Sequence, residues 1–336
     1  MPSTFVGIDV SKREFTAAIA AEGTPPAQAR RLPAKTFANS ADGIAAFVRW
    51  IEGNGGTTAC LCAESTGVYS LRLAADLRAR APHLPALTIV NPSGIMGTAA
   101  SLGLRDKSDL LDAAVIAIHA LVHRPEPTES TSPRLDELNE LFALRDALVR
   151  DRTAHLNRLE QVRNRSVSRL LEDQIKALDK QIAKVDKAID RCIAADEQLR
   201  RDNELLQSVR GIGRILAIAI LAEFGDLRRW KRGQVASYAG VYPRTHESGT
   251  SVFRAPRMIK GGASRLRRVL YMAAVSFVRS GPGAESHRRF QERGKTKMCS
   301  IGAQMRKLLL IARAVVVSNT PFDITKNGAS TTHQSP

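Results

Sequence analysis

Four acidic residues in this chain could together carry out metal-dependent chemistry. They occur as Gly-Ile-Asp9, Ala-Glu64-Ser and Lys-Ser-Asp109-Leu-Leu-Asp112. Removing a carboxylate from water is costly unless it is paired or binds a cation. Mg²⁺ prefers oxygen ligands, and two such ions can hold the attacking and leaving oxygens of an in-line phosphoryl displacement. The four acids therefore predict a nuclease-type site with Mg²⁺, as two ions, for its cofactor.

The elements around these acids are two buried strands and one helix. Asp9 lies inside an apolar run and Glu64 ends another, which is typical of buried strands. Asp109 and Asp112 are three residues apart on an expected helix, so they share one face. Asp106 extends that pattern and could be a loop residue, a helix cap or a contributor behind the ligands, so we do not count it as a ligand.

The first part of the chain alternates strands and helices. Strands are expected at 4–10, 14–21, 34–38, 57–64 and 86–90, and helices at 41–52, 69–80, 93–102 and 108–122. This alternation predicts an α/β domain over residues 1–125.

Prolines at 125, 127 and 133 mark a linker, and long helices are expected after it. Apolar residues then recur at steps of three and four at Leu171, Ile175, Leu178, Ile182, Val185, Ile189 and Ile193. This heptad pattern predicts a coiled coil or helical hairpin within residues 126–204. The pattern suits a spacer within one chain as well as an element that joins a homo-oligomer, a dimer or tetramer.

The net charge of +17 resides in the last part of the chain. Residues 206–336 hold 23 Lys and Arg against 6 Asp and Glu, whereas the preceding residues are close to neutral. This asymmetry predicts a mainly α-helical, nucleic-acid-binding domain at 205–322, with affinity that falls as salt rises. A basic face that only aids solubility is the alternative. Residues 323–336 are small and polar, and we expect them to be disordered.

Gly211-Ile-Gly213 stands between two apolar helical stretches. It looks like the turn of a helix-hairpin-helix element, in which backbone N–H groups bind a phosphate. A plain tight turn explains the tripeptide equally well, but the surrounding positive charge favours the phosphate. The residues that we predict to bind nucleic acid are Gly211, Gly213, Arg214, Arg244, Arg254, Arg257, Lys260, Arg265 and Arg268.

The stretch 239–251 is rich in turn formers and reactive side chains. A hydroxyl in a flexible loop, followed by a cationic cluster, could attack a phosphate and form a phosphoserine. Ser248 stands beside the small Gly249, which keeps its hydroxyl accessible. On the residues alone a turn or cap role for Ser248 is the commoner case, and Tyr242 and His246 are rivals as nucleophile and base.

In order and spacing, these motifs together resemble the DEDD transposases, recombinases of a bacterial insertion-sequence family that use a bridge RNA. The motifs are Gly7-Ile-Asp9, Glu64-Ser-Thr-Gly, Asn91-Pro92, Lys107-Ser-Asp109-Leu-Leu-Asp112, Gly211-Ile-Gly213, and Tyr238-Ala-Gly240-Val-Tyr-Pro-Arg244 with Glu247-Ser248-Gly249. The resemblance covers almost the whole chain.

The resemblance implies a ribonuclease-H-like (RuvC-like) N-terminal domain, a coiled coil and a C-terminal transposase domain. It implies that Asp9, Glu64, Asp109 and Asp112 are the acidic set and that Ser248 is the nucleophile. It further implies that the protein cuts and rejoins donor and target DNA under the direction of a structured guide RNA. Sequence choice then rests on base pairing, as in other RNA-guided systems.

Three other functions are weighed against this one. A RuvC-like structure-specific endonuclease would use metal-activated water and release free 5′-phosphate ends. A sugar-kinase-like ATPase also opens with Gly-Ile-Asp, but the chain lacks a second Gly-rich phosphate loop and ends in a basic segment. A nucleic-acid-binding scaffold with degenerate acids is the non-enzymatic alternative, which the complete acidic set disfavours.

Other features of the sequence limit the classes to which the protein can belong. No apolar run approaches the roughly 18 residues that a membrane-spanning helix needs. The first strand begins almost at the N-terminus, which leaves no room for a signal peptide. The four cysteines form no C-x-x-C pair, which argues against a disulfide framework or a structural zinc. We therefore expect a cytoplasmic bacterial protein with no membrane partner.

Overall fold

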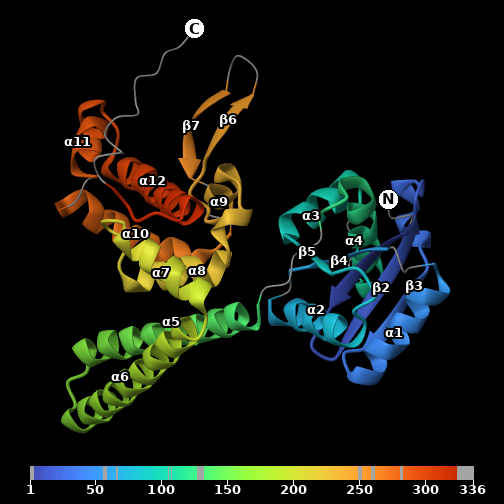
Figure 1. Cartoon of the computed structure of the whole chain (residues 1–336), viewed down its shortest axis with the longest axis horizontal. Coiled ribbons are helices and arrows are strands. Elements are labelled where there is room, and N and C mark those ends of the chain that lie inside the picture. Colours follow the sequence, from blue (N-terminus) through green and yellow to red (C-terminus); the bar gives the residue numbers. More distant parts are fainter. Residues whose placement is uncertain are drawn as a thin grey trace. The chain divides into compact units, whose positions relative to one another are not determined.

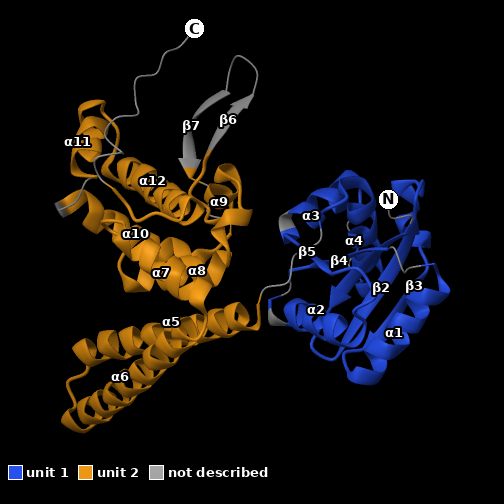
Figure 2. Cartoon of the chain, in the orientation of Figure 1, with its two compact units in different colours: residues 1–130 blue, residues 131–336 orange. Residues whose placement is uncertain are grey.

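The computed structural model describes residues 4–55, 59–65, 67–104, 106, 108–126, 132–248, 252–258, 262–280 and 283–323. For residues 68, 93, 244–248, 252–257 and 280 it describes the backbone only. The chain divides into two compact units, Met1–Ser130 and Thr131–Pro336 (Figures 1 and 2). The expected disordered tail lies outside the described residues from position 324 onward.

Unit 1 is built on a five-stranded mixed sheet in the order β3-β2-β1-β4-β5. Its strands are β1 (Thr4–Val10), β2 (Glu14–Ala21), β3 (Ala34–Ala38), β4 (Cys60–Glu64) and β5 (Thr88–Val90). β2 is antiparallel to both β1 and β3, whereas β4 is parallel to both β1 and β5. The expected α/β class is confirmed, although the last two strands are shorter than expected.

Helices cover both faces of this sheet (Figure 1). They are α1 (Ala41–Gly53), α2 (Val68–Arg80), α3 (Pro92–Ser101) and α4 (Asp109–His123), with the 3-10 helix η1 (Pro26–Arg31). α1 and α2 pack on Val6 and Ile8, whereas α4 packs on Phe5 and Cys62. Because successive strand residues point to opposite faces, the odd-numbered residues of β1 and the even-numbered residues of β4 face α4.

Gly7 allows the backbone of α4 to lie directly against β1. A Cβ atom on Gly7 would lie 2.1 Å from the backbone N of Ala117 and 2.2 Å from the carbonyl O of Ala113. Side chains normally hold a helix away from a sheet, so only glycine permits this approach. Ser108 caps α4, since its Oγ accepts the N–H of Leu111 at 3.3 Å, and the helix therefore begins at Asp109.

Unit 2 consists of a long helical hairpin and a helical region that carries a small two-stranded sheet. Its elements are α5 (Pro133–Gln161), α6 (Arg165–Ala194), α7 (Glu197–Ser208), α8 (Arg214–Phe224), η3 (Leu227–Arg229), α9 (Arg232–Tyr238), β6 (Pro243–Ser248), β7 (Val252–Met258), α10 (Ser264–Ser280), α11 (Ala284–Glu292) and α12 (Lys297–Ser318). α5 and α6 lie side by side and form the hairpin (Figure 1).

One hydrophobic core continues from the hairpin into the helices after it. Phe142 of α5 and Ile189 of α6 belong to the same buried cluster as Leu216 of α8 and Leu270 of α10. The expected boundary near residue 205 is therefore not a break in packing. The part of the hairpin nearer its turn, residues 149–184, contributes no residue to this core.

The structure differs from the sequence expectation at residues 239–251. We expected a flexible loop there, but residues 243–248 form β6, which pairs antiparallel with β7. The turn formers concentrate at residues 249–251, outside the described residues. The flanking Thr245 and Val252 are β-branched and favour strands.

The close approach at Gly7 gives a stability prediction. We expect Gly7→Ala to lower the free energy of unfolding of unit 1 by about 3 kcal/mol, the upper end of overpacking costs, because backbone atoms cannot move aside. Urea unfolding of the full chain, followed by circular dichroism, measures this loss.

Gly97→Ala is the matched control, because Gly97 is helical and a Cβ atom there would meet no other atom within 4 Å. It should raise stability by up to about 1 kcal/mol. Equal effects of the two substitutions would contradict the role given to Gly7.

Candidate active site and nucleic-acid interface

Asp9 and Glu64 lie next to each other on the face of the sheet that α4 covers. The parallel register pairs Gly7 of β1 with Cys62 of β4. Two residues further along, the same register brings Asp9 beside Glu64, with both side chains on the side of Gly7 and Cys62. Both residues are partly buried.

Asp109 and Asp112 enter this region from the first turn of α4. Burial raises the pKa of Asp9 to about 6, and repulsion by the carboxylates of Asp109, Asp112 and Glu64 adds to the effect. Elements far apart in sequence thus bring Glu64, Asp109 and Asp112 close enough to repel the carboxylate of Asp9. The contact of α4 with Gly7 sets their spacing.

All four side chains are carboxylates, which are the ligand type that Mg²⁺ prefers, but they do not converge on one point in this structure. Within the described residues, no three Asp, Glu, His or Cys side chains form a ready-made metal site. However, the neighbouring groups are carboxylates, and their mutual repulsion is what a bound cation would relieve.

Asp106 takes no part in this group. It precedes the Ser108 cap, so it lies outside α4. Its carboxylate accepts a hydrogen bond from the Arg30 guanidinium at 2.7 Å, and its side chain is 72% exposed. Of the three roles considered for Asp106, the structure shows a loop residue in a surface ion pair.

Sequence reasoning missed two hydroxyl residues beside the acids. Thr16 of β2 lies opposite Asp9 in the ladder, is buried, and has its Oγ1 2.9 Å from the Oγ1 of Thr36. A threonine in an otherwise alanine-rich strand, 14–21, was the available signal, and only the register reveals its position. These hydroxyls continue the polar row that starts at Glu64.

Ser248 is the last residue of β6, where the ladder pairs it with Val252. The same ladder pairs Arg244 with Arg257 and His246 with Arg254. The side chains of these residues are not described, and Lys260 lies outside the described residues. Ser248 and the four acids belong to different units.

Arg214, predicted to bind nucleic acid, is engaged inside unit 2. Its guanidinium donates to Asp186 at 2.9 Å and to Asp190 at 2.7 Å. Arg145 also donates to Asp186, at 2.8 Å. Burial by itself would raise the pKa of Asp186, but the hydrogen bonds from Arg145 and Arg214 lower it overall. This network ties α8 to the hairpin.

Two further predicted cations, Arg265 and Arg268, have similar roles. The Nε of Arg265 donates to the buried carboxylate of Glu223 at 3.0 Å, and its Nη2 donates to Asn139 at 2.9 Å. Arg268 donates to Asp146 at 3.2 Å. The hydrogen bonds from Arg265 to Asn139 and from Arg268 to Asp146 fasten α10 to α5 of the hairpin. Both arginines therefore stabilise the packing of unit 2.

Gly211-Ile-Gly213 connects α7 to α8, as the helix-hairpin-helix interpretation requires. Gly211 has a φ of +100°, and a Cβ there would lie 2.7 Å from the ring of Phe277. Gly213 is the N-cap of α8 and has open space where a side chain would stand. Arg210 lines an open hollow of about 670 Å³ beside this turn.

Comparison with known families identifies the family to which a chain with these two units belongs. The family described as "Transposase IS116/IS110/IS902 family" matches residues 203–291, and a DEDD family described as "Transposase" matches residues 6–166. Relatives that span the whole chain agree with both matches. The chain belongs to the IS110 family of insertion-sequence transposases, so it is a DNA-processing enzyme that acts in recombination.

The full-length relatives include the pilin gene-inverting protein of Moraxella bovis, which is 32% identical over 96% of this chain and 98% of its own length. The Moraxella lacunata protein of that name is 32% identical over the same shares. The transposase for insertion sequence element IS1111A of Coxiella burnetii is 24% identical over 52% of this chain and 56% of its own length. No helix among the described residues is both long and apolar enough to cross a membrane.

The raised pKa of Asp9 gives a pH-dependent stability prediction. Its folded pKa of about 6 exceeds the ordinary 3.8, so ionisation of Asp9 destabilises the fold as pH rises through this window. Asp9→Asn should therefore stabilise the metal-free protein above pH 6, by about 1–2 kcal/mol after allowance for partial exposure, with no gain below the ordinary pKa. Thermal unfolding across this pH range, in a chelator, measures the difference.

The Arg214 network gives a prediction that separates structural from nucleic-acid roles. Arg214→Gln should lower the free energy of unfolding by about 1–2 kcal/mol, because the partly buried Asp186 loses one of its two arginine donors. Denaturant unfolding and DNA titration at several salt concentrations check this. A shallower salt dependence of DNA binding with unchanged stability would instead make Arg214 a phosphate contact.

Proposed function

We propose that this transposase cuts and rejoins DNA by metal-dependent phosphoryl transfer that uses both units. The observation that supports the proposal is geometric: the strand register brings Asp9 beside Glu64, and Asp109 and Asp112 lie in the first turn of α4, which packs on β1. Bringing four carboxylates together costs free energy because they repel one another, and solvation of a surface gives no reason for such a cluster. Catalytic acids of phosphoryl-transfer enzymes do so in order to hold metal ions.

The sheet order supports a ribonuclease-H-like, RuvC-like assignment for unit 1. Three antiparallel strands followed by two parallel ones, in the order β3-β2-β1-β4-β5, agree with that fold. The first strand carries Asp9 and the fourth carries Glu64, side by side, as the family resemblance implies. In this proposal Asp9, Glu64, Asp109 and Asp112 would hold Mg²⁺, which would polarise the scissile phosphate.

Ser248 is the proposed nucleophile. Its Oγ gives up its proton and forms a bond to phosphorus while one P–O bond of the DNA backbone breaks, and the leaving oxygen takes up a proton to become a hydroxyl, so the step neither gains nor loses a proton overall. The phosphodiester is kept as a phosphoserine, which a DNA hydroxyl can attack in turn to rejoin a strand. The family resemblance and the position of Ser248 at the end of β6 support this role.

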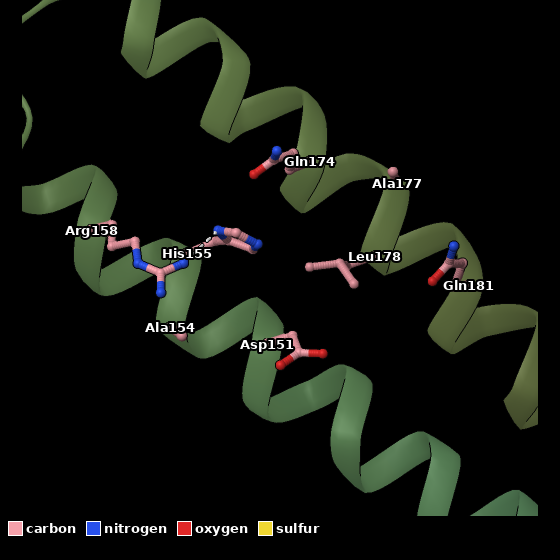
Figure 3. Close-up of a pocket in the computed structure, with 8 residues that line it drawn as sticks. All are labelled: Asp151, Ala154, His155, Arg158, Gln174, Ala177, Leu178 and Gln181. Atoms are coloured by element: carbon pink, nitrogen blue, oxygen red, sulfur yellow. Dashed lines mark hydrogen bonds between the residues drawn. The ribbon is translucent and has the colours of Figure 1, made fainter.

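A guide RNA and assembly from several copies complete the proposal. The family resemblance supports the RNA, and the hairpin supports assembly, because Leu144 and Leu170 are 50% and 66% exposed along it. A groove of about 330 Å³ between α5 and α6 lies on the same hairpin (Figure 3). There the small Ala154 and Ala177 leave space beside Leu178.

The names of the relatives suggest that the same chemistry can have two outcomes. The two Moraxella proteins are named for inverting a pilin gene, and the Coxiella protein is named as a transposase. Cutting and rejoining through a covalent intermediate would serve inversion as well as transposition. The alternative, a RuvC-like endonuclease that uses water, forms no such intermediate.

Trapping the covalent intermediate tests the proposed function. Full-length protein is incubated with end-labelled element-junction DNA, Mg²⁺ and RNA transcribed from the flank of the element. We expect label that migrates with the protein on a denaturing gel, and we expect Ser248→Ala and Asp9→Asn each to abolish it. Asp9→Asn should still bind DNA, since only the metal site is altered.

Two matched variants make this result specific. Ser237→Ala alters an exposed serine of α9 and should keep the adduct, as should Tyr242→Phe. An adduct that survives Ser248→Ala but not Tyr242→Phe would move the nucleophile to Tyr242. Cut DNA without an adduct would instead show attack by water.

A further inference from the structure

The positive charge of unit 2 is not spread evenly once its ion pairs are considered. Arg214, Arg265 and Arg268 are each paired with acids of the fold. In contrast, residues 288–297 hold five Lys and Arg and a single acid. Uncompensated charge therefore gathers at the corner where α11 ends and α12 begins, which is outside both segments that match the family.

Three cations define this corner: Arg293, Lys295 and Lys297. All three are exposed. In the described part of the chain their side chains form no ion pair, whereas Arg288 pairs with Glu292 and Arg289 with Glu285. Three unpaired like charges within five residues repel one another, and a polyanion would relieve that repulsion.

Hydrogen bonds hold the backbone of this corner in a defined turn. α11 ends in a Schellman motif, in which the N–H of Lys295 donates to the carbonyl of Phe290 at 3.0 Å and the N–H of Gly294 donates to that of Gln291 at 2.8 Å. Gly294 has the positive φ, +69°, that this motif requires. Thr296 then caps α12 by accepting the N–H of Cys299 at 3.2 Å.

Buried polar contacts also fix α11 against α12. The Nδ1 of His287 lies 2.7 Å from the Oγ of Ser300, and Gln304 donates to Ser286 at 2.9 Å. Ser300 and Gln304 are 0% and 1% exposed. The three cations therefore stand on a rigid base, and less conformational entropy is lost when they bind a partner.

We propose that Arg293, Lys295 and Lys297 bind the phosphate backbone of duplex DNA. The family acts on DNA, which supplies the polyanion. Residues 291–299 contain no aromatic side chain, and aromatic side chains are what single-strand binders use to stack bases. The corner therefore suits a duplex, whose bases are already stacked and whose phosphates lie outermost. Contacts of this kind position DNA without reading its sequence.

Salt-dependent binding by the full-length protein tests this proposal. The triple variant Arg293→Gln, Lys295→Gln, Lys297→Gln is titrated into a fluorescein-labelled random-sequence DNA duplex in EDTA, so neither metal nor Ser248 chemistry enters. We expect the slope of log K against log salt to become shallower by about 2–3, and affinity at about 0.1 M salt to fall at least about tenfold. Circular dichroism should be unchanged, because the three exposed side chains form no ion pair with the described part of the fold.

Lys180→Gln, Lys184→Gln, Lys187→Gln is the matched control. It removes the same charge from exposed positions of α6, where lysines alternate with Asp179, Asp186 and Asp190. The control should keep the wild-type slope. Equal effects of the two triple variants, or no effect at the corner, would overturn the proposal. A loss confined to a structured RNA, with duplex DNA binding intact, would overturn the assignment to DNA.

Discussion

The contact between Gly7 and the backbone of α4 is the constraint on which the acidic site of unit 1 depends. Asp9 stands two residues along β1 from this contact, and Asp112 immediately precedes Ala113, one of the residues that Gly7 touches. No side chain separates helix from strand at that point, so the distance between the carboxylates is set by backbone packing. The site can therefore hold its acids together against their repulsion without relying on flexible loops.

The stability of unit 1 and the chemistry of its site oppose each other. Burial and like charge raise the pKa of Asp9, and both effects weaken the folded state at neutral pH. Phe15, Phe37 and Phe47 pack as one aromatic cluster on the opposite face of the sheet. The face that carries the acids also buries an apolar cluster, which includes Phe5 and Cys62 under α4. Packing on both faces thus offsets the cost of bringing the acids together.

The α/β elements and the acidic set could be predicted from sequence because their signals are local. Apolar runs, the N-caps Ser40 and Ser108, and the spacing of Asp109 and Asp112 depend on nearby residues only. The roles of Gly7 and Thr16 could not be predicted, since they arise from a helix crossing and a strand register. β6 and β7 were missed because the turn formers of 239–251 were interpreted as one loop, whereas residues on either side of 249–251 form two short strands that pair with each other.

The assignment of cations shows most clearly why charge in a sequence does not locate a binding surface. Arg214 and Arg265 looked like phosphate ligands by residue type and by the charge of the segment around them. Their acidic partners lie in α6 for Arg214 and in α8 for Arg265, and only the fold brings them together. An arginine that already donates to an acid of the fold gains little from a phosphate, because it must first break that hydrogen bond. The charge that remains available to nucleic acid is therefore the charge that the fold leaves unpaired.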